Sequence, residues 1–447
     1  MDNTDDIKQR RVRIAVLTLF IIIVTFLAIY GIIYAVGRTG GKMLTREEIE
    51  GNIAVADASD KDYTYAASYL AEWGIRGFDG AKFKTCEYYF SKYSIYHQDS
   101  SKQLAKDTAR LFLEYFYDET DHSDSEVLTD ALISCYVEAF GDKYAVYRTA
   151  TQHEDYNTSM SGSFVGIGVR VLYSEEDGTI TVLSVNEDSA AEDAGILAGD
   201  IIHAVDGELV SELGYEGAVS KIRGDIGTDV TVTVKRGEEL IDLVATRRQV
   251  IEKTVQYQIT ESKIAIITIT QFKANTFEQF KSAVDKAEAD KAKAIVFDLC
   301  DNPGGYLNSV VQVIDYIAPD GVRIASYTSM TDGEIIFEAD DGHSISLPIA
   351  VVFNEHTASA GELFSAAMRD YGDMGVLDVT TVGVKTYSKG VMQSTMTFAD
   401  RSTLTFTIAF YNPPCDVNYD GVGVTPDIYE EDDGKRLDVA ISALIEK

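Results

Sequence analysis

The sequence predicts a multidomain α/β protein with an N-terminal transmembrane helix, a helical segment, a β-rich domain and an α/β core with a β-rich tail. Three observations support this fold class. Residues 14–37 carry no charge, apolar spacing changes from helical to strand-like near residue 163, and strands alternate with helices from residue 263. A chain of 447 residues also exceeds one ordinary hydrophobic core, so several domains are expected.

The apolar stretch 14–37 contains 24 residues, and a helix of that length spans a bilayer core of about 30 Å. Basic residues are more numerous before it (Lys8, Arg10, Arg11 and Arg13) than directly after it (Arg38 and Lys42). This predicts cytoplasmic residues 1–13, a single-pass anchor in the cell membrane and an extracytoplasmic remainder. The alternative is a cleaved signal peptide, but the run is long and no small-x-small site ends it.

The charge of the chain excludes one class of partner. Its 72 acidic and 39 basic residues give a formal net charge of −33. Because phosphate binding needs a cationic face, we expect no nucleic-acid partner. The four cysteines show no metal-ligand spacing, so no metal is expected and free buried thiols are the preferred interpretation. A disulfide between Cys86 and Cys135 is the alternative.

Residues 44–160 are predicted to be helical. Thr45 and Glu48 have the spacing of a capping box, and apolar residues recur at helical spacing over 103–117 and 125–140. The preferred interpretation is an ordinary helical core. A dimerisation arm, which would make the protein a homodimer, is the alternative.

The remaining chain divides into a β-rich region, 161–250, and an α/β region, 251–447. In the first, we expect two short helices and strands at 166–173, 179–185, 200–205 and 228–236. The helices are near 190–194 and 215–222. In the second, strands at 263–269, 293–299 and 349–354 alternate with helices at 276–289, 306–317 and 361–371. Residues 390–410 form the β-rich tail.

Ser359 is a candidate nucleophile. It stands in the stretch 354–362, Asn-Glu-His-Thr-Ala-Ser-Ala-Gly-Glu, between a buried strand and an amphipathic helix. A serine at such a turn exposes its hydroxyl beside backbone amides at the helix N-terminus. The plain alternative is that Thr357 or Ser359 caps the helix.

Lys389 is the candidate base for this serine. A lysine accepts a proton only when neutral, and burial favours the neutral form. If Lys389 opens a strand, Gln393 four residues later lies on the same face and can orient its amine. His356 is the alternative base, although three residues before Ser359 is a poor position for one.

A third stretch, 297–307, contains Asn-Pro-Gly-Gly between a buried strand and a helix. Amides of Gly304 or Gly305 can stabilise an oxyanion there. A plain strand-to-helix turn is the alternative.

In this order along the chain, these stretches resemble the carboxyl-terminal processing peptidases, the tail-specific proteases of family S41, over nearly everything beyond about residue 125. Residues 140–147 resemble the family's lead into its PDZ domain, and 164–169 resemble the PDZ carboxylate-binding loop. DLCDNPGG resembles DLRxNPGG, TASAGE resembles SASASE, and SKGVMQ resembles GKGxxQ. The PDZ core and the terminal GIxPDI motif are matched by 194–207 and 423–428.

The resemblance implies a ClpP/crotonase-like peptidase core and a role for each matching residue. Ser359 would be the nucleophile, Lys389 the base, Gln393 its orienting partner and Asp370 a supporting acid. The amide of Ala360, with that of Gly304 or Gly305, would form the oxyanion hole. Carboxylate binding by the PDZ domain is implied for Val165, Gly166, Ile167 and Gly168. Two departures are Cys300 in place of an arginine and Ser388 in place of a glycine.

The function expected from the resemblance is a membrane-anchored serine endopeptidase whose substrates are proteins or peptides with free C-termini. It would need no cofactor and no metal. The alternative is a membrane-tethered PDZ scaffold that binds C-terminal peptides without cleaving them. The stretch 416–427 has the spacing of a calcium loop, but no helix precedes it, so a plain connection is preferred.

Overall fold

The computed structural model describes residues 43–56, 65–96, 100–174 and 177–446. They divide into two compact units. The first contains the described residues up to His153 together with Tyr327–Ile335 and Val391–Tyr411. The second contains Glu154–Ser326, Ile336–Gly390 and the chain from Asn412 onward. A segment that the sequence assigned to the last domain therefore folds with the N-terminal helices.

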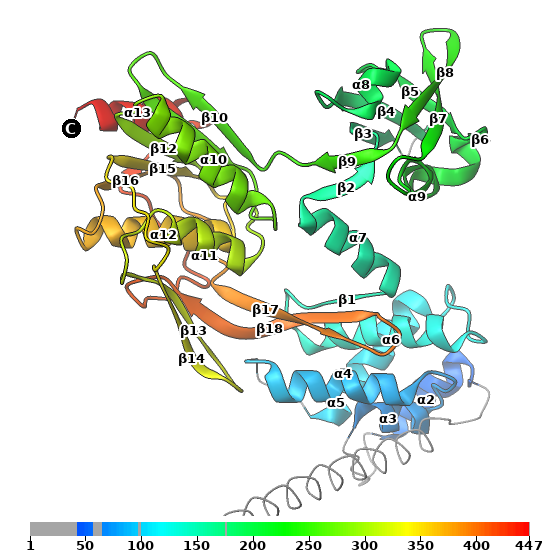
Figure 1. The fold of residues 1–447 in the computed structure, drawn as a ribbon. Helices are drawn as coiled ribbons and strands as arrows, with labels where there is room; N and C mark the ends of the chain where they lie inside the picture. The colour runs from blue at the N-terminus through cyan, green and yellow to red at the C-terminus, as the bar shows by residue number, and fades with distance from the viewer. Residues whose placement is uncertain (1–42, 57–64, 97–99, 175–176, 447) are drawn as a thin grey trace, which may run out of the picture. The chain divides into compact units, whose positions relative to one another are not determined.

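Helical segments build the described N-terminal part of the first unit (Figure 1). Asp79, Ser100 and Asp124 accept hydrogen bonds from backbone N–H groups in the first turns of three of them. The segments are α2 (Arg46–Ala56), α3 (Ala66–Trp73), α4 (Gly80–Tyr93), α5 (Ser101–Leu111), the π-helical turn η1 (Phe112–Phe116) and α6 (Ser125–Phe140).

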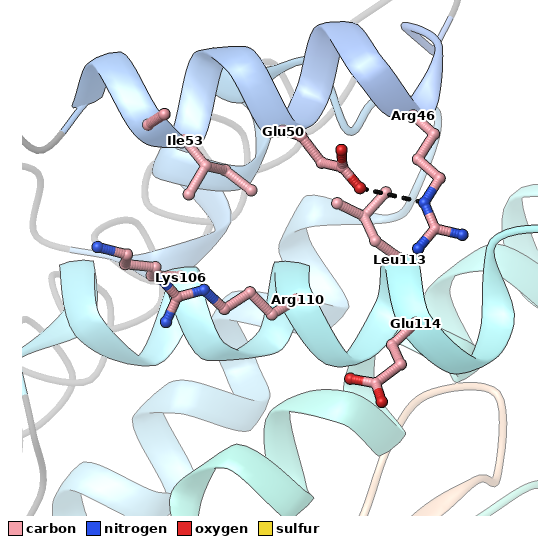
Figure 2. A pocket seen from close by; sticks show the side chains of 8 residues that line it. Arg46, Glu50, Ile53, Lys106, Arg110, Leu113 and Glu114 are labelled. Atoms are coloured by element: carbon pink, nitrogen blue, oxygen red, sulfur yellow. Dashed lines mark hydrogen bonds and ion pairs between the residues drawn. The ribbon is translucent and has the colours of Figure 1, made fainter.

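A groove of about 490 Å³ lies between α2 and the α5–η1 segment (Figure 2). Arg46, Lys106 and Arg110 line it, as do Glu50 and Glu114. Within the groove, Arg46 Nε donates to Glu50 Oε1 over 3.1 Å. Side chains of both signs are present, so the groove has no single charge preference.

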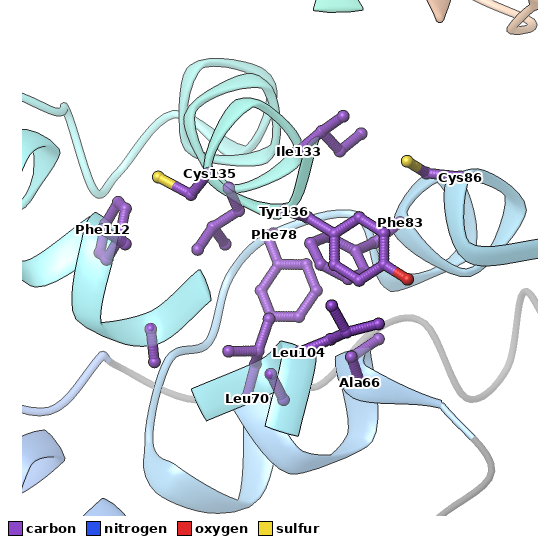
Figure 3. Close-up of a cluster of buried hydrophobic side chains, with 14 of the residues drawn as sticks. Ala66, Leu70, Phe78, Phe83, Cys86, Leu104, Phe112, Ile133, Cys135 and Tyr136 are labelled. Atoms are coloured by element: carbon purple, nitrogen blue, oxygen red, sulfur yellow. The ribbon is translucent and has the colours of Figure 1, made fainter. Parts of the chain in front are cut away.

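The aromatic residues of these helices pack into their own core (Figure 3). Tyr136 on α6 meets Phe83 on α4 edge to face, with ring centroids 5.2 Å apart. Cys86 and Cys135 are buried here, and both are free thiols. This is the ordinary helical core that the sequence favoured. The described residues offer no support for the dimerisation arm.

A hairpin from late in the chain joins this core. Its strands β17 (Val391–Thr397) and β18 (Thr403–Asn412) pair antiparallel, and Asp142 after α6 accepts from the Thr407 N–H at 2.8 Å. The sheet order is β1-β18-β13-β14, with β17 on β18. The other strands are β1 (Val146–Arg148), β13 (Arg323–Ser329) and β14 (Gly333–Glu338).

Ion pairs of Lys82 on α4 link the hairpin to the helices. Its side chain is only 9% exposed and forms ion pairs with Asp130 at 2.8 Å and with Asp400 at 2.6 Å. The same amine donates a hydrogen bond of 2.6 Å to the Tyr147 hydroxyl. Separating the partners would leave an uncompensated buried charge, which is unfavourable. These contacts therefore stabilise the packing of α4, α6 and the hairpin turn.

The β-rich domain of the second unit has the sheet order β3-β4-β5-β7-β8. Strand β3 pairs with β4, so β3 is an edge of this sheet. Its elements are β3 (Val169–Ser174), β4 (Thr179–Val185), α8 (Ala190–Ala194), β5 (Ile201–Val205), β6 (Glu208–Leu209), α9 (Val210–Ile222), β7 (Asp229–Arg236) and β8 (Glu239–Thr246). Helix α7 (Ala150–Ser161) precedes the pair β2 (Ser163–Gly166) and β9 (Arg248–Ile251).

The α/β core is a six-stranded sheet of order β10-β11-β12-β15-β16-β19. All neighbours are parallel except the edge pair β10–β11. The strands are β10 (Val255–Ile259), β11 (Ile264–Ile269), β12 (Ala294–Asp298), β15 (Ile349–Phe353), β16 (Val379–Gly383) and β19 (Ile428–Tyr429). The helices are α10 (Thr276–Ala289), α11 (Leu307–Asp315), α12 (Ala360–Asp373) and α13 (Asp433–Ile445).

Helices cover both faces of this sheet, which explains why its central strands are continuously apolar. On one face, Val296 and Val352 pack with Ala440 of α13. On the other face, Phe297 contacts Phe280 of α10 and Phe364 of α12, with centroids 5.5 and 5.6 Å apart. Alternation along β12 therefore assigns neighbouring residues to opposite layers.

The predicted transmembrane helix is corrected by the structure. Among the residues that it describes, no helix is both long and apolar enough to cross a membrane. The longest of them, α6, has 16 residues and a length of about 24 Å, short of a bilayer core. The predicted segments 1–13 and 14–37 lie outside the described residues. The transmembrane helix of the predicted fold class and the predicted single-pass location in the cell membrane therefore find no support among the described helices.

A buried carboxyl in the helical core predicts a pH dependence of stability. Burial raises the pKa of Glu87 to about 7, although its hydrogen bonds from the Ala66 and Ala67 N–H groups act in the opposite direction. An acid whose pKa is higher in the folded state than in the unfolded state loses stability as pH rises through that interval. We expect the Tm of the helical unit to fall between pH 5 and pH 8, and Glu87→Gln to remove several degrees of that fall.

The control for this measurement is Glu47→Gln, which changes an exposed carboxyl on α2 and should leave the pH dependence as it is in the parent. Differential scanning calorimetry of the full chain at both pH values measures the effect. An identical fall in Glu87→Gln and in the parent would contradict this account.

Candidate active site

Three loops meet at the carboxyl edge of the α/β sheet. Strands β12, β15 and β16 are parallel neighbours, so the loops that follow them leave the same edge. These loops are 299–306, 354–359 and 384–390. They contain the Asn-Pro-Gly-Gly turn, Ser359 and Lys389, so the sheet order alone brings the three predicted stretches together. The carboxyl edge of such a sheet is where ligands of open α/β folds bind.

Side-chain and backbone hydrogen bonds join the first two loops. Asn354 Oδ1 accepts from the Asp301 N–H at 3.0 Å, and Asn354 Nδ2 donates to Asp301 Oδ1 at 2.9 Å. The Ala358 N–H donates to the Asn302 carbonyl at 2.9 Å. Thr357 is fully buried and donates its hydroxyl to the Leu299 carbonyl. The two loops therefore form one hydrogen-bonded layer.

Ser359 has an unusual backbone. It is half-buried at the start of α12, with φ +54° and ψ −118°. A residue other than glycine rarely adopts a positive φ, and such strain gathers at functional turns. The sharp strand-to-helix turn is the geometry expected of a nucleophile.

Glu362 is the residue that sequence reasoning left without a role. Its side chain is fully buried. Oxygen Oε2 accepts from the Ser359 N–H at 2.9 Å and from the Lys389 N–H at 2.8 Å. Oxygen Oε1 accepts from the Thr386 hydroxyl at 2.5 Å and from the Ser388 N–H at 2.7 Å. One carboxylate thus ties the serine to the lysine loop. The Ser-x-x-Glu spacing of a capping box was the signal that could have identified it.

Residues 418–421 also hold the lysine loop through hydrogen bonds. The Gly390 N–H donates to Asp420 Oδ1 at 3.0 Å, and Asn418 Nδ2 donates to the Gly390 carbonyl at 2.8 Å. The Gly421 N–H donates to the Ser388 carbonyl. Ser388 itself has φ +82°, a conformation that suits the glycine it replaces. These contacts fix the backbone on both sides of Lys389, which is half-buried.

The predicted oxyanion residues lie against the serine. A Cβ added at Gly304 would stand 2.8 Å from the Ala360 nitrogen and 2.8 Å from Ser359 Cβ. Only glycine therefore allows this approach. The Gly304 N–H already donates to Asn302 Oδ1 at 2.8 Å, which makes the Gly305 N–H the better oxyanion candidate of the two glycines.

The position of Gln393 relative to Lys389 differs from the one expected from the sequence. Strand β17 begins at Val391, after Lys389, and its register with β18 shifts between Met392 and Gln393, where Ile408 of β18 is the extra residue. Because Lys389 lies before the strand, alternation along β17 does not relate its side chain to that of Gln393. The Gln393 amide donates to the Val391 carbonyl and to Thr407 Oγ1 at 3.4 and 3.5 Å.

Asp370 lies on α12 eleven residues after Ser359, or about 16 Å along the helix axis. It accepts from the Cys415 N–H at 2.8 Å, and burial raises its pKa. Asp370 thus supports the loop after β18, near the C-terminal end of α12. His356 is exposed and uses its backbone N–H on Asn354 Oδ1.

The predicted carboxylate loop lines a groove in the β-rich domain. The groove has a volume of about 230 Å³ between β3 and α9. Gly166, Ile167 and Gly168 line it, whereas Val165 pairs with Gln249 in the β2–β9 ladder. Apolar side chains from both elements, including Val169, Val171, Val219 and Ile222, complete the lining.

The stretch 416–427 acts as a connection. Asp416 pairs with Arg323 at 3.0 Å, Asp420 accepts from the Gly390 N–H, and Asp427 accepts from Thr381. Across the part of the chain that the structure describes, no group of three or more metal-ligating side chains is found. All four cysteines are free, with Cys300 half-buried and Cys415 exposed.

The contacts of Glu362 generate a prediction on stability. In Glu362→Gln an NH₂ group replaces one oxygen and cannot accept, so two of the four donors lose their partner. Each buried unsatisfied donor costs about 1–3 kcal/mol, so we expect the Tm of this domain to fall by about 5 °C or more. Glu278→Gln, on the exposed surface of α10, is the control and should change it little. Thermal unfolding measures both; equal midpoints would refute the role of Glu362.

Comparison with known proteins agrees with this geometry. Residues 263–430 match the model of peptidase family S41, and residues 181–236 match a PDZ domain model. The "Probable CtpA-like serine protease" of Staphylococcus aureus (strain COL) is 34% identical over 68% of this chain and 60% of its own length. The relative from Staphylococcus saprophyticus is 32% identical over 74% of this chain and 65% of its own.

Among solved structures, the photosystem II D1 C-terminal processing protease is 21% identical, with a TM-score of 0.45, over 78% of this chain and 92% of that one. This chain spans about 60% of the length of the curated relatives from Staphylococcus aureus. The resemblance predicted from the sequence is confirmed at the level of domains: residues 263–430 match peptidase family S41, residues 181–236 match a PDZ domain, and the curated relatives with similar sequence are CtpA-like serine proteases.

Proposed function

We propose that this protein is a serine endopeptidase that cleaves protein substrates selected by their C-terminal tails. Ser359 is the nucleophile and Lys389 is the general base. The observation that carries the proposal is the shared contact with Glu362, because the Ser359 and Lys389 amide nitrogens each lie within 2.9 Å of the same oxygen atom.

The reaction follows from the roles of these groups. Neutral Lys389 takes the hydroxyl proton as Ser359 attacks the scissile carbonyl. The amides of Ala360 and Gly305 donate to the developing oxyanion, where fixed dipoles are most effective. The lysine then returns the proton to the leaving amine, and water hydrolyses the acyl-enzyme by the same steps.

The β-rich domain supplies substrate selection. Its edge strand β3 offers unpaired backbone groups to a peptide strand, and the groove beside it is mainly apolar. A free C-terminal carboxylate binds at the backbone of Ile167 and Gly168, and the side chains of the tail enter the groove at alternate positions.

Substitution of the dyad tests the chemistry. We expect Ser359→Ala and Lys389→Ala each to lower kcat/KM on an unstructured protein substrate by about a thousandfold or more. Lys385→Ala changes an exposed lysine of the same loop and should behave like the parent. Full cleavage by Lys389→Ala, with loss of cleavage in His356→Ala, would contradict the lysine base and favour a Ser-His arrangement.

A chemical change in the tail tests the selection. A peptide with an apolar C-terminal residue should bind the full chain at least about tenfold more tightly with a free carboxylate than as its C-terminal amide, since the backbone donors recognise the charged group. Fluorescence anisotropy measures both affinities in Ser359→Ala. Equal affinities would contradict tail selection, and tail binding by a parent that cleaves nothing would favour the scaffold alternative.

A further inference from the structure

Arg436 occupies an unexpected place. It lies in the first turn of α13 and is only 3% exposed. Arginine is rarely fully buried unless it is paired, and the N-terminal end of a helix disfavours a cation. A specific set of contacts must therefore compensate for both costs.

Those contacts anchor the guanidinium and aim it toward the active-site edge of the sheet. Nε donates to the Glu430 carbonyl at 2.9 Å, and Nη2 donates to the Glu431 carbonyl at 3.1 Å. Nη1 forms an ion pair with Asp433 but makes no hydrogen bond within the described residues. Nη2 also lies 3.8 Å from Glu355 Oε2. Glu355 belongs to the serine loop, four residues before Ser359.

The Asn-Pro-Gly-Gly loop approaches the same helix at Cys300. Burial raises the pKa of the Cys300 thiol to about 12, Asp298 acts in the same direction, and the hydrogen-bonded Arg436 guanidinium opposes them. Cys300 also packs against the apolar layer formed under α13. Arg436 therefore contacts the serine loop at Glu355, and Cys300 brings the loop of the candidate oxyanion amides against the same helix.

We propose that Arg436 is a positioning residue, whose guanidinium holds the Cys300 and Glu355 loops in the arrangement that forms the oxyanion site. The inference rests on the proposed function. In the peptidases that this chain resembles, an arginine stands at the position of Cys300. Here α13 carries a cation that lies beside the serine loop, and Cys300 packs against the same helix.

The test compares Arg436→Met with the parent in the full chain. Methionine keeps an apolar stem of similar length but cannot pair with either loop. We expect kcat to fall about ten- to hundredfold with KM within about twofold, because small misplacements of reacting groups have effects of this size. Hydrogen exchange at 300–306 and 354–360 should rise about tenfold or more, whereas exchange in β11 stays unchanged.

Two further variants separate positioning from plain stability. Lys435→Met changes the exposed neighbouring cation on α13 and should match the parent in kcat and in exchange. Adding Cys300→Arg to Arg436→Met should restore kcat at least about tenfold, because it returns a guanidinium to the same place. A variant that loses Tm but keeps the parental kcat and loop exchange would overturn the proposal, as would failure of the double variant to recover.

If Arg436→Met does not fold, Arg436→Lys answers the same question. Its single ammonium cannot contact both loops at once, so kcat should fall and loop exchange should rise; parental values would overturn the proposal. If the parent itself cleaves nothing, the proposed function fails, while the exchange rates of the two loops still decide whether Arg436 positions them.

Discussion

The buried carboxylate of Glu362 is the interaction on which the candidate site depends. Burying a carboxylate is unfavourable unless its oxygens accept hydrogen bonds, and here four donors meet them. Three of these donors come from the 384–390 loop and one comes from Ser359. The requirement to satisfy this group therefore sets the spacing between the serine and the lysine loop, since neither loop can move without leaving a buried donor unpaired.

The sheet makes this contact possible. Parallel neighbours β12, β15 and β16 deliver three loops to one edge, and the Asn354–Asp301 pair joins two of them. The third loop is held by the 418–421 segment through Asn418 and Asp420. Asp420, one of the acidic residues that suggested a calcium loop, thus supports the backbone around Lys389. In our proposal, Arg436 also holds active-site loops in place, from the face of the sheet on which α13 lies.

Regular elements of the α/β core and the β-rich domain could be predicted because their signals are local. Strand 179–185 and helices 190–194 and 276–289 have the predicted bounds. The three site stretches carried recognisable turn chemistry. Long-range features had no such signal. Nothing near Val391 shows that its hairpin packs with helices that are 250 residues or more away, and nothing near Lys389 shows that the strand begins only at Val391.

Other differences have equally specific causes. Gly214 has φ +67° and ψ −177°, so α9 is kinked directly before the helix predicted from Tyr215 onward. The role of Glu362 depends on a loop that is 24 to 27 residues later, which a capping-box motif alone does not reveal. The membrane anchor was inferred from hydropathy, the flanking basic residues and the lack of a cleavage site, and no described helix supports it.

The most direct test of the account is covalent labelling of the serine. The parent, Lys389→Ala and Glu362→Gln are treated with a fluorophosphonate, and the adduct is located by mass spectrometry. The account predicts an adduct on Ser359 in the parent that forms about a hundredfold or more slowly in both variants, because the base is absent in one and misplaced in the other. An adduct on a different residue, or equal rates in all three proteins, would contradict it.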